Sequence, residues 1–472
     1  AAARAPLLLH AALVLGGCLA APAAGPNEDS RLGADDECAE HADEGACGLS
    51  ALQVSGRRTR ARAGNSGAGF AWRTMADVAA EANGFPKKVA YDYAKCDLGS
   101  STCELSSFSK PTLVYPGGRT RCFNGDAYAF AVVPGDSDKL LFYFEGGGAC
   151  WELDGHVVES CTKDLLGAVQ DSGYGLGVQD MADPRNPFRN YTVVEPLYCS
   201  GDAFVGNTTE MWKKGAEPQV GYVNTRAALD WAKANVAPEL SSLVISGYSA
   251  GALGTMAWAS KIFDTLPFKE GAVLADSYAG VFPPFTEGPI FKMFGACSTD
   301  LLSDPELQGL CNAGDIRMRQ VYEQAMKSNP DVPFGNIQSK YDGVQIWFYE
   351  SVAKSNDMDD HANLPSKDFY VTTVELFERY ERAYPNFAVF FVNSGKHCYT
   401  QDPDFFTATA ASSEAGRAEF VPLYEWVGKF VRGQATKSIC HGALANSTAG
   451  LAASGEFCSE QLSRAEVKLR RQ

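Results

Sequence analysis

Five short apolar runs, separated by amphipathic stretches, constrain the fold of this chain more than any other feature. Each run is apolar almost throughout, which is typical of strands that are buried on both faces of a sheet. The runs cover residues 140–144, 192–198, 242–246, 272–275 and 387–392. Apolar residues recur at helical spacing between them, in 222–236 and again after residue 249. Strand–helix alternation of this kind predicts an α/β domain with a mostly parallel sheet and helices on both faces.

The two ends of the chain differ from this middle region. An apolar, Ala- and Gly-rich run after Arg4 has the pattern of a secretory signal peptide and is too short for a membrane span. A bacterial lipoprotein signal is the alternative, because residues 15–18 read Leu-Gly-Gly-Cys. We expect a signal peptide over 1–24, a low-complexity linker or pro-region over 25–85, the sheet domain over 86–435 and a disulfide-containing tail over 436–472.

Charge and cysteine content narrow the class of protein. The chain has 57 acidic and 41 basic residues, a net charge of −16, which argues against non-specific binding of nucleic acid. Fourteen cysteines without a zinc-type CxxC pair favour an oxidising, secretory environment. Asn-x-Ser/Thr acceptors at Asn190, Asn207 and Asn446 predict a glycoprotein. We therefore expect a secreted monomer, extracellular or in a cell wall, with no transmembrane segment.

Close spacing suggests five disulfide pairs. They are 38/47, 96/103, 150/161, 297/311 and 440/458. Once Cys18 is removed with the signal, Cys122, Cys199 and Cys398 remain. One of these three is then free, or one of the pairs is wrong, because spacing alone does not fix connectivity.

A serine follows the third apolar run in the setting of a nucleophile. Residues 247–251 read Gly-Tyr-Ser-Ala-Gly, a G-x-S-x-G pattern between a predicted strand and a predicted helix. Such a sharp turn exposes the serine oxygen at the sheet edge, beside the free N–H groups of the helix N-terminus. We predict that Ser249 is the nucleophile and that the N–H of Ala250 is part of an oxyanion hole. The alternative is a Gly/Ser-rich turn with an inert serine.

Three glycines follow the first run. Residues 145–151 read Glu-Gly-Gly-Gly-Ala-Cys-Trp. Backbone without side chains can direct N–H groups at a developing oxyanion, so we assign Gly147 and Gly148 to the oxyanion hole as well. The alternatives are a flexible loop and a phosphate cradle, but the Gly-Lys-Ser/Thr sequence of a phosphate loop does not follow.

His397 is the predicted base, both by its position and by elimination among the six histidines. It follows the last apolar run, which gives the chain order serine, acid, histidine that is expected for an α/β-hydrolase. His156 follows the glycine loop, and we place it at the mouth of the site. We interpret the acidic run before His361 as a solvated loop. A metal site in 357–361 is disfavoured because no second ligand cluster is visible.

Two aspartates between Ser249 and His397 are candidates for the acid of the triad. Asp276 directly follows the fourth run, and Asp342 lies in the stretch 335–345. Chain order alone does not decide between them.

Seven ordered motifs make the chain resemble the pectin acetylesterase / Notum carboxylesterase family. They are Arg-Cys-Phe-Asn-Gly at 121–125, Phe-Glu-Gly-Gly-Gly at 144–148, Tyr-Cys-Ser-Gly-Asp at 198–202, Ser-Gly-Tyr-Ser-Ala-Gly at 246–251, Ala-Asp-Ser-Tyr-Ala-Gly at 275–280, Tyr-Asp-Gly-Val-Gln at 341–345 and His-Cys at 397–398. The family carries its catalytic acid in Tyr-Asp-x-x-Gln. The resemblance therefore implies that Asp342 is the acid and that Asp276 is a structural residue beneath the site.

The chain departs from the family pattern in two places. The family has a tryptophan in the glycine loop just before its cysteine, whereas this chain has Ala149 there and Trp151 after Cys150. The elbow carries Tyr248 and Ala252, where the family often has small residues or glycine. The first change alters the predicted pocket wall.

These residues together predict a serine carboxylesterase that needs neither a metal nor an organic cofactor. We favour removal of O-acetyl groups from pectin or a related polysaccharide, which the resemblance implies. One alternative is a Notum-like lipid deacylase that acts on an acylated protein, because acyl tunnels carry no motif. The other is a catalytically inactive relative that binds carbohydrate or protein, against which the intact set Ser249, Asp342 and His397 argues.

Overall fold

The computed structural model describes residues 92–440, except for 154–155, 213–214, 415–416 and 435–437. The predicted signal peptide and linker lie outside the described residues, as does the predicted tail beyond residue 440. The predicted pairs 38/47 and 440/458 and the acceptor Asn446 are therefore not described.

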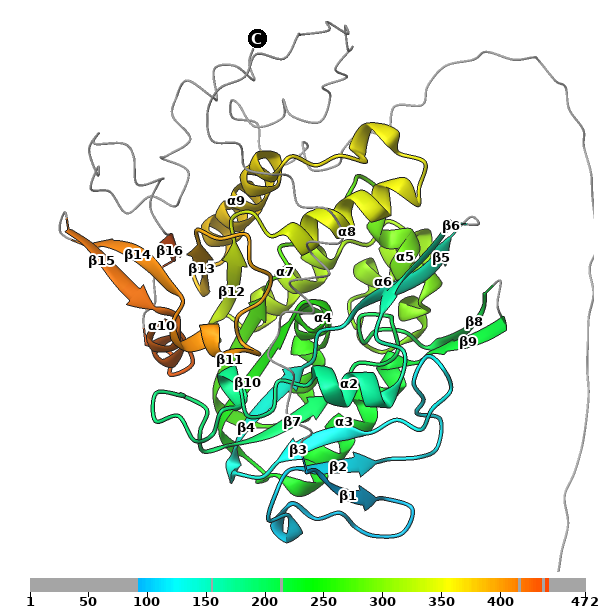
Figure 1. The fold of residues 1–472 in the computed structure, drawn as a ribbon, viewed down its shortest axis with the longest axis vertical. Coiled ribbons are helices and arrows are strands. Elements are labelled where there is room, and N and C mark those ends of the chain that lie inside the picture. Colours follow the sequence, from blue (N-terminus) through cyan, green and yellow to red (C-terminus); the bar gives the residue numbers. More distant parts are fainter. Residues whose placement is uncertain (1–91, 154–155, 213–214, 415–416, 435–437, 441–472) are drawn as a thin grey trace, which may run out of the picture. The chain divides into compact units, whose positions relative to one another are not determined.

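A ten-stranded sheet forms the centre of the described region (Figure 1). In sheet order its strands are β1 (Ala94–Asp97), β2 (Thr112–Tyr115), β3 (Phe130–Val133), β7 (Tyr191–Pro196), β4 (Asp136–Phe144), β10 (Leu240–Tyr248), β11 (Phe268–Asp276), β12 (Phe334–Ser339), β13 (Phe387–Val392) and β16 (Ile439–Cys440). Strand β3 is antiparallel to both of its neighbours, and every other pairing in the sheet is parallel. The prediction of a mostly parallel sheet is confirmed, and each of the five apolar runs forms a strand of it.

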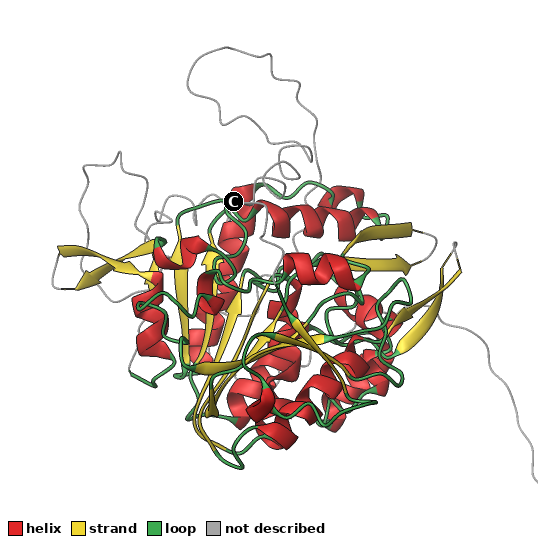
Figure 2. Cartoon of the chain, turned by 60° about the horizontal axis from the view of Figure 1, so that its bottom comes forward, coloured by secondary structure: helices red, strands yellow, loops and turns green. Residues whose placement is uncertain are grey.

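Helices lie on both faces of the sheet (Figure 2). They are α2 (Leu165–Asp171), α3 (Gly221–Asn235), α4 (Ala250–Thr265), α5 (Glu287–Met293), α6 (Pro305–Ala313), α7 (Met318–Ser328), α8 (Gly343–Lys354), α9 (Ser366–Ala383) and α10 (Leu423–Phe430). Alternate residues of β4 belong to different cores, because Phe142 and Phe144 join one apolar cluster whereas Leu141 and Tyr143 join the other. Burial on both faces explains why the run is apolar throughout. Within the described residues, no helix is both long enough and apolar enough to cross a membrane.

Three antiparallel hairpins extend from this core. They are β5 (Gly148–Leu153) with β6 (His156–Cys161), β8 (Thr208–Trp212) with β9 (Gly215–Gln219), and β14 (Thr409–Glu414) with β15 (Arg417–Pro422). The first begins inside the glycine loop, so two of the predicted oxyanion residues, Gly147 and Gly148, lie at the root of a hairpin.

Strand β12 is not among the five predicted strands, although all of its residues are buried. Its sequence is Phe-Gly-Asn-Ile-Gln-Ser, and its polar side chains have polar partners. The Asn336 amide donates to the Tyr278 carbonyl at 3.0 Å, and Gln338 Oε1 accepts from Gln345 at 3.0 Å. The strand lacks the usual apolar signature because it supplies polar support beneath the candidate site.

Four disulfides lie within the described residues: Cys96–Cys103, Cys122–Cys199, Cys150–Cys161 and Cys297–Cys311. Three of them match predicted pairs. The fourth joins two of the three leftover cysteines, and Cys398 is a buried free thiol. The alternative in which one of the three is free is therefore correct.

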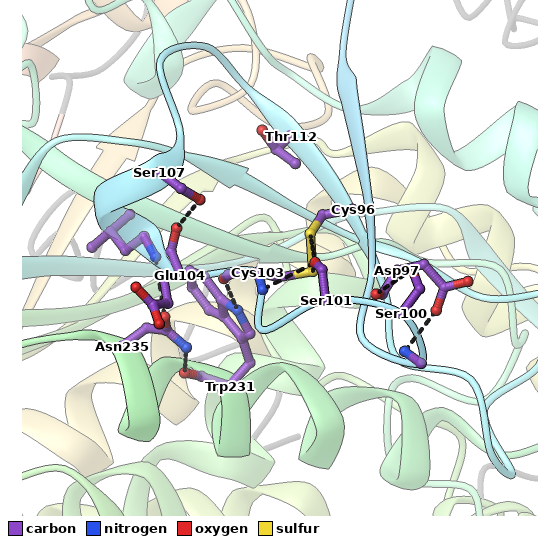
Figure 3. The surroundings of a disulfide bond; sticks show 12 residues. Cys96, Asp97, Ser100, Ser101, Cys103, Glu104, Ser107, Thr112, Trp231 and Asn235 are labelled. Carbon is purple, nitrogen blue, oxygen red and sulfur yellow. Dashed lines mark hydrogen bonds between the residues drawn. A yellow bond between two sulfur atoms is a disulfide. The ribbon is translucent and has the colours of Figure 1, made fainter.

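The Cys96–Cys103 loop fixes the N-terminal edge of the sheet to α3 (Figure 3). The Trp231 indole N–H donates to the Cys103 carbonyl at 2.9 Å, and the Asn235 side chain accepts from the Leu105 N–H at 3.0 Å. Both partners lie on the last turns of α3, so a short disulfide loop at the sheet edge is tied to a core helix.

Candidate active site

Neighbouring parallel strands bring the predicted site residues to one edge of the sheet. Strands β4, β10, β11, β12 and β13 are adjacent in that order and parallel. At or just beyond their carboxyl ends lie the glycine loop, Ser249, Asp276, Asp342 and His397. Sites of open α/β sheets form at the carboxyl ends of strands. The sheet thus brings five segments that are distant in sequence to the same edge.

Ser249 occupies a strained turn between β10 and α4. Its φ of 55° and ψ of −122° lie in a region that residues other than glycine rarely adopt. A Cβ at Gly251 would overlap the Phe144 carbonyl oxygen of β4, which explains the glycine two residues after the serine. The Ser249 N–H donates to the Asp276 carbonyl at 2.9 Å. This geometry is that of the nucleophile elbow of α/β-hydrolases.

Asp342 and His397 form a direct pair. His397 Nδ1 lies 2.8 Å from Asp342 Oδ2 and 3.0 Å from Oδ1. The carboxylate also caps α8, because its Oδ1 accepts the N–H groups of Val344 and Gln345, each at 3.0 Å. It is fully buried, whereas the imidazole is 18% exposed. The arrangement directs the lone pair or the proton of the other ring nitrogen, Nε2, away from Asp342.

His397 Nε2 is buried and has no hydrogen-bond partner among the described residues. Burial alone lowers the pKa of the imidazole, but the charge and hydrogen bonds of Asp342 outweigh it, so the pKa of His397 lies above its ordinary value of 6.5. A buried, unpaired nitrogen on a ring made more basic is the arrangement that a general base needs.

Asp276 has a different environment from Asp342. Its Oδ2 accepts the N–H groups of Tyr399 and Thr400 at 2.7 Å and the Thr400 hydroxyl at 2.8 Å. Its Oδ1 accepts the Ser277 hydroxyl at 2.8 Å, and that hydroxyl accepts the Cys398 N–H at 2.8 Å. The side chain of Asp276 therefore holds the loop that follows His397, while its backbone carbonyl holds Ser249.

The glycine loop lies beside the elbow. Gly147 and Gly148 have φ values of 151° and 74°. A side chain at Gly148 would overlap the Ser160 carbonyl oxygen of β6, so only glycine fits there. The Gly147 carbonyl accepts the Thr162 N–H at 2.9 Å, and the Cys150 N–H donates to the Gly201 carbonyl at 2.9 Å. The ideal Cβ position of Gly146 is only 3.0 Å from Ser249 Cβ, which puts the loop in contact with the predicted nucleophile.

Sequence reasoning did not assign a role to two glutamines that support the acid. Gln345 Nε2 donates to Asp342 Oδ2 at 2.9 Å and to Gln338 Oε1 at 3.0 Å, and its Oε1 accepts the Ala279 N–H at 2.8 Å. The signal for Gln345 was its place in the Tyr-Asp-x-x-Gln motif. No sequence pattern indicated a role for Gln338, because it lies in β12, which is not an apolar run.

The remaining described histidines lie away from this cluster. His361 Nδ1 lies 3.0 Å from the Tyr349 hydroxyl, and His156 Nε2 lies 3.4 Å from Asp357, at the far end of the β5–β6 hairpin. The acidic run 357–361 includes a short 3-10 turn, Asp359–His361. Among the residues with described positions, no group of three or more His, Cys, Asp or Glu side chains is arranged to hold a metal ion.

Comparison with known proteins agrees with the motifs. Residues 111–415 match the model of the pectinacetylesterase family. The chain belongs to the pectinacetylesterase family. Pectin acetylesterase 11 of Arabidopsis thaliana is 27% identical to it over 172 residues, which are 34% of this chain and 42% of that protein. The aligned region thus spans less than half of that relative.

Solved structures similar to this pectinacetylesterase-family chain include two crystal forms of the Wnt deacylase Notum from Drosophila. The first has a TM-score of 0.44 and 15% identity, and the match covers 71% of this chain and 96% of that one. The second has a TM-score of 0.42 and 16% identity, and it covers 70% and 95% of the two chains.

The departures from the family pattern have local structural consequences. Trp151, which follows Cys150, is 2% exposed, and its indole N–H donates to the hydroxyl of Ser355, the C-cap of α8, at 3.2 Å. It therefore ties the hairpin to a helix. Tyr248 packs against Gly146, and its hydroxyl donates to the Asp171 carbonyl at the end of α2. In this member of the pectinacetylesterase family, Trp151 thus anchors the hairpin, and Tyr248 contacts the glycine loop.

Proposed function

We propose that this chain is a secreted serine carboxylic-ester hydrolase that removes O-acetyl groups from pectin or a related polysaccharide. The Asp342–His397 pair carries the proposal, because a buried carboxylate holds one ring nitrogen while the other is buried and unpaired within the described residues. Family membership supports an ester substrate, and the name of the Arabidopsis relative supports an acetyl group and pectin.

In the proposed mechanism Ser249 Oγ attacks the ester carbonyl, and His397 Nε2 accepts its proton. Asp342 keeps the other proton on Nδ1 and stabilises the imidazolium. The N–H groups of Gly147, Gly148 and Ala250 bind the oxyanion, where one such donor is typically worth about 3 kcal/mol. His397 then protonates the leaving alcohol, and water attacks the acyl-enzyme by the same route in reverse.

The disulfides support the secretory part of the proposal. Four bonded pairs among the described residues are typical of proteins that fold in an oxidising compartment. The acceptor Asn190 is exposed, whereas Asn207 is half-buried and accepts from Arg119 at 3.3 Å. Asn190 is thus the better-placed of the two described glycosylation acceptors.

Hydrolysis of p-nitrophenyl esters from acetate to palmitate tests the proposed acyl group. A deacetylase is expected to prefer acetate. A preference for octanoate or longer chains would point to a lipid deacylase, and no turnover of any ester would point to an inactive binding protein.

The nucleophile is tested by Ser249→Ala. We expect kcat on p-nitrophenyl acetate to fall by about 10⁴-fold or more with the fold retained, because the attacking oxygen is gone. The exposed Ser303→Ala serves as the matched control and should keep the parent rate. Near-parental turnover by Ser249→Ala would rule out this serine as the nucleophile.

A further inference from the structure

A groove with a mixed polar and apolar lining lies between the β5–β6 hairpin and α8. Its volume is about 440 Å³. Polar and aromatic side chains from the two elements line it, among them His156, Glu159 and Ser160 of β6 and Trp347, Ser351 and Lys354 of α8. The three α8 residues are four and then three positions apart, so they share one face of the helix.

The walls of the groove are fixed to each other at the end farthest from the candidate triad. The Trp151 indole of β5 donates to Ser355, the residue that follows α8, and His156 of β6 lies 3.4 Å from Asp357, two residues further on. Glu159 is paired with Lys163 at 3.0 Å. The hairpin and the helix are therefore held side by side, and the groove between them exists before any ligand binds (Figure 1).

Both walls begin at the proposed catalytic machinery. The hairpin starts at Gly148 and returns to Cys161, and α8 is capped by Asp342. With a rise of about 1.5 Å per residue, the helix places Trp347 about 7 Å and Lys354 about 18 Å beyond the cap. A small ester held at Ser249 does not extend that far. The groove is in the position to take further units of a long alcohol component.

The lining identifies the chemistry of those units. Trp347 offers an aromatic surface, and its ring is held edge-on against Phe348 with ring centroids 4.8 Å apart. Ser351 and Ser160 offer hydroxyl groups. The side chain of Lys354 is exposed, and its ammonium group makes no ion pair or hydrogen bond with any described residue. A flat apolar surface, hydroxyl partners and an uncommitted ammonium group match a sugar ring that carries a carboxylate.

We propose that this groove is a subsite for uronic-acid units of the polysaccharide, with Trp347 against a sugar face and Lys354 on a carboxylate. The inference rests on the proposed function, since it extends the alcohol side of the same substrate. The subsite would hold the polymer in register while its acetyl group lies at Ser249.

Binding is measured directly, without turnover, in the full chain carrying Ser249→Ala. Isothermal titration calorimetry is run with an unesterified hexamer of galacturonic acid and with cellohexaose as the neutral probe. We expect Trp347→Ala to weaken binding of the acidic hexamer by about tenfold. The matched control Phe420→Ala, an exposed aromatic on the β14–β15 hairpin, should change it by less than about twofold.

The charge is tested separately. Lys354→Gln should weaken binding of the galacturonate hexamer by several-fold and leave the affinity for cellohexaose as it was, whereas Lys233→Gln on α3 should change neither. Ser351→Phe, which fills the groove, should abolish binding of the galacturonate hexamer. It is the alternative test if Trp347→Ala does not fold. Unaltered affinity in both Trp347→Ala and Ser351→Phe, or no binding of either hexamer by the parent, would overturn the subsite.

The two proposals can fail independently. If the chain with Ser249 intact hydrolyses p-nitrophenyl acetate but the groove variants bind like the parent, only the subsite is wrong. If it hydrolyses no ester but the groove variants lose the hexamer, the groove binds uronates and the esterase proposal is wrong.

Discussion

At the scale of single residues, two buried aspartates at one sheet edge have different partners. Asp342 contacts the imidazole, and Asp276 contacts backbone N–H groups of the following loop. We expect Asp342→Asn to lower kcat by several orders of magnitude in a folded protein, because an amide favours the wrong tautomer of His397. Asp276→Asn should instead mainly lower the free energy of unfolding, by about 1–3 kcal/mol, since an NH₂ group cannot accept those hydrogen bonds.

Kinetics on p-nitrophenyl acetate and denaturant melts distinguish these two outcomes. Asp331→Asn, at an exposed position, is the control for the change from carboxylate to amide. If Asp276→Asn destroys activity in a stable protein while Asp342→Asn merely unfolds more easily, the roles of the two aspartates are reversed.

The pH profile follows from the same pair. Asp342 raises the pKa of His397 above 6.5, and only the neutral imidazole accepts a proton. The acidic limb of kcat/KM should therefore have its midpoint above 6.5 and should move to lower pH in Asp342→Asn, because the ring then loses the charge of Asp342, which opposes the effect of burial. The raised pKa of His397 also contributes to the free energy of unfolding. This contribution is fully present below pH 6.5 and is lost as the pH rises through the raised pKa. A limb that stays in place in the variant would contradict the coupling.

At the scale of elements, the β5–β6 hairpin connects a disulfide to the oxyanion loop. The Cys150–Cys161 bond lies at its root, and the Cys150 backbone is held on both sides, by the Gly201 carbonyl and by the Gln219 side chain. We predict that Cys150→Ser/Cys161→Ser has a lower kcat than the parent when both are assayed well below the melting temperature of the variant. The reason is that Gly147 and Gly148 lose the anchor that orders their backbone.

The Cys297–Cys311 disulfide provides the control for this effect. Cys297→Ser/Cys311→Ser removes a bond of similar loop length, and each loss should cost about 3 kcal/mol in the chain-entropy model. Equal destabilisation with a fall in kcat only for the 150/161 pair supports the positioning role. If both double variants keep the parent kcat, the bond only stabilises the fold.

The same scale shows what sequence alone could predict. Apolar runs identified strands such as β4 and β13 because both of their faces lie in the core. The strand-to-helix pattern and chain order predicted Ser249 and His397, the family resemblance added Asp342, and the structure brings the last two residues into contact. Strand β12 and Gln338 were missed because polar residues in a buried strand are recognised only through partners that are distant in sequence. Likewise, no spacing rule could join Cys122 to Cys199 across 77 residues.

At the scale of the whole molecule, we expect the loss of the long-range disulfide Cys122–Cys199 to lower the free energy of unfolding more than the loss of any other described disulfide. In the chain-entropy model a loop of 77 residues contributes about 4–5 kcal/mol, against about 3 kcal/mol for the 14-residue separation of Cys297–Cys311. Cys122→Ser/Cys199→Ser should therefore lower the free energy of unfolding more than Cys297→Ser/Cys311→Ser does. Guanidinium titrations of the two double variants check the order, and the reverse order would show that native packing outweighs loop length at these sites.

Asp276 also determines when, during biosynthesis, the site can first exist. It is joined to Ser249, 27 residues before it, and to Thr400, 124 residues after it. A nascent chain therefore displays the elbow long before the loop that orients the histidine has left the ribosome. Until that loop emerges, the Asp276 carboxylate lacks the N–H donors of Tyr399 and Thr400, and His397 is not yet positioned. In the proposed mechanism, a chain that ends before residue 400 therefore lacks the loop that positions His397, and it should not hydrolyse esters.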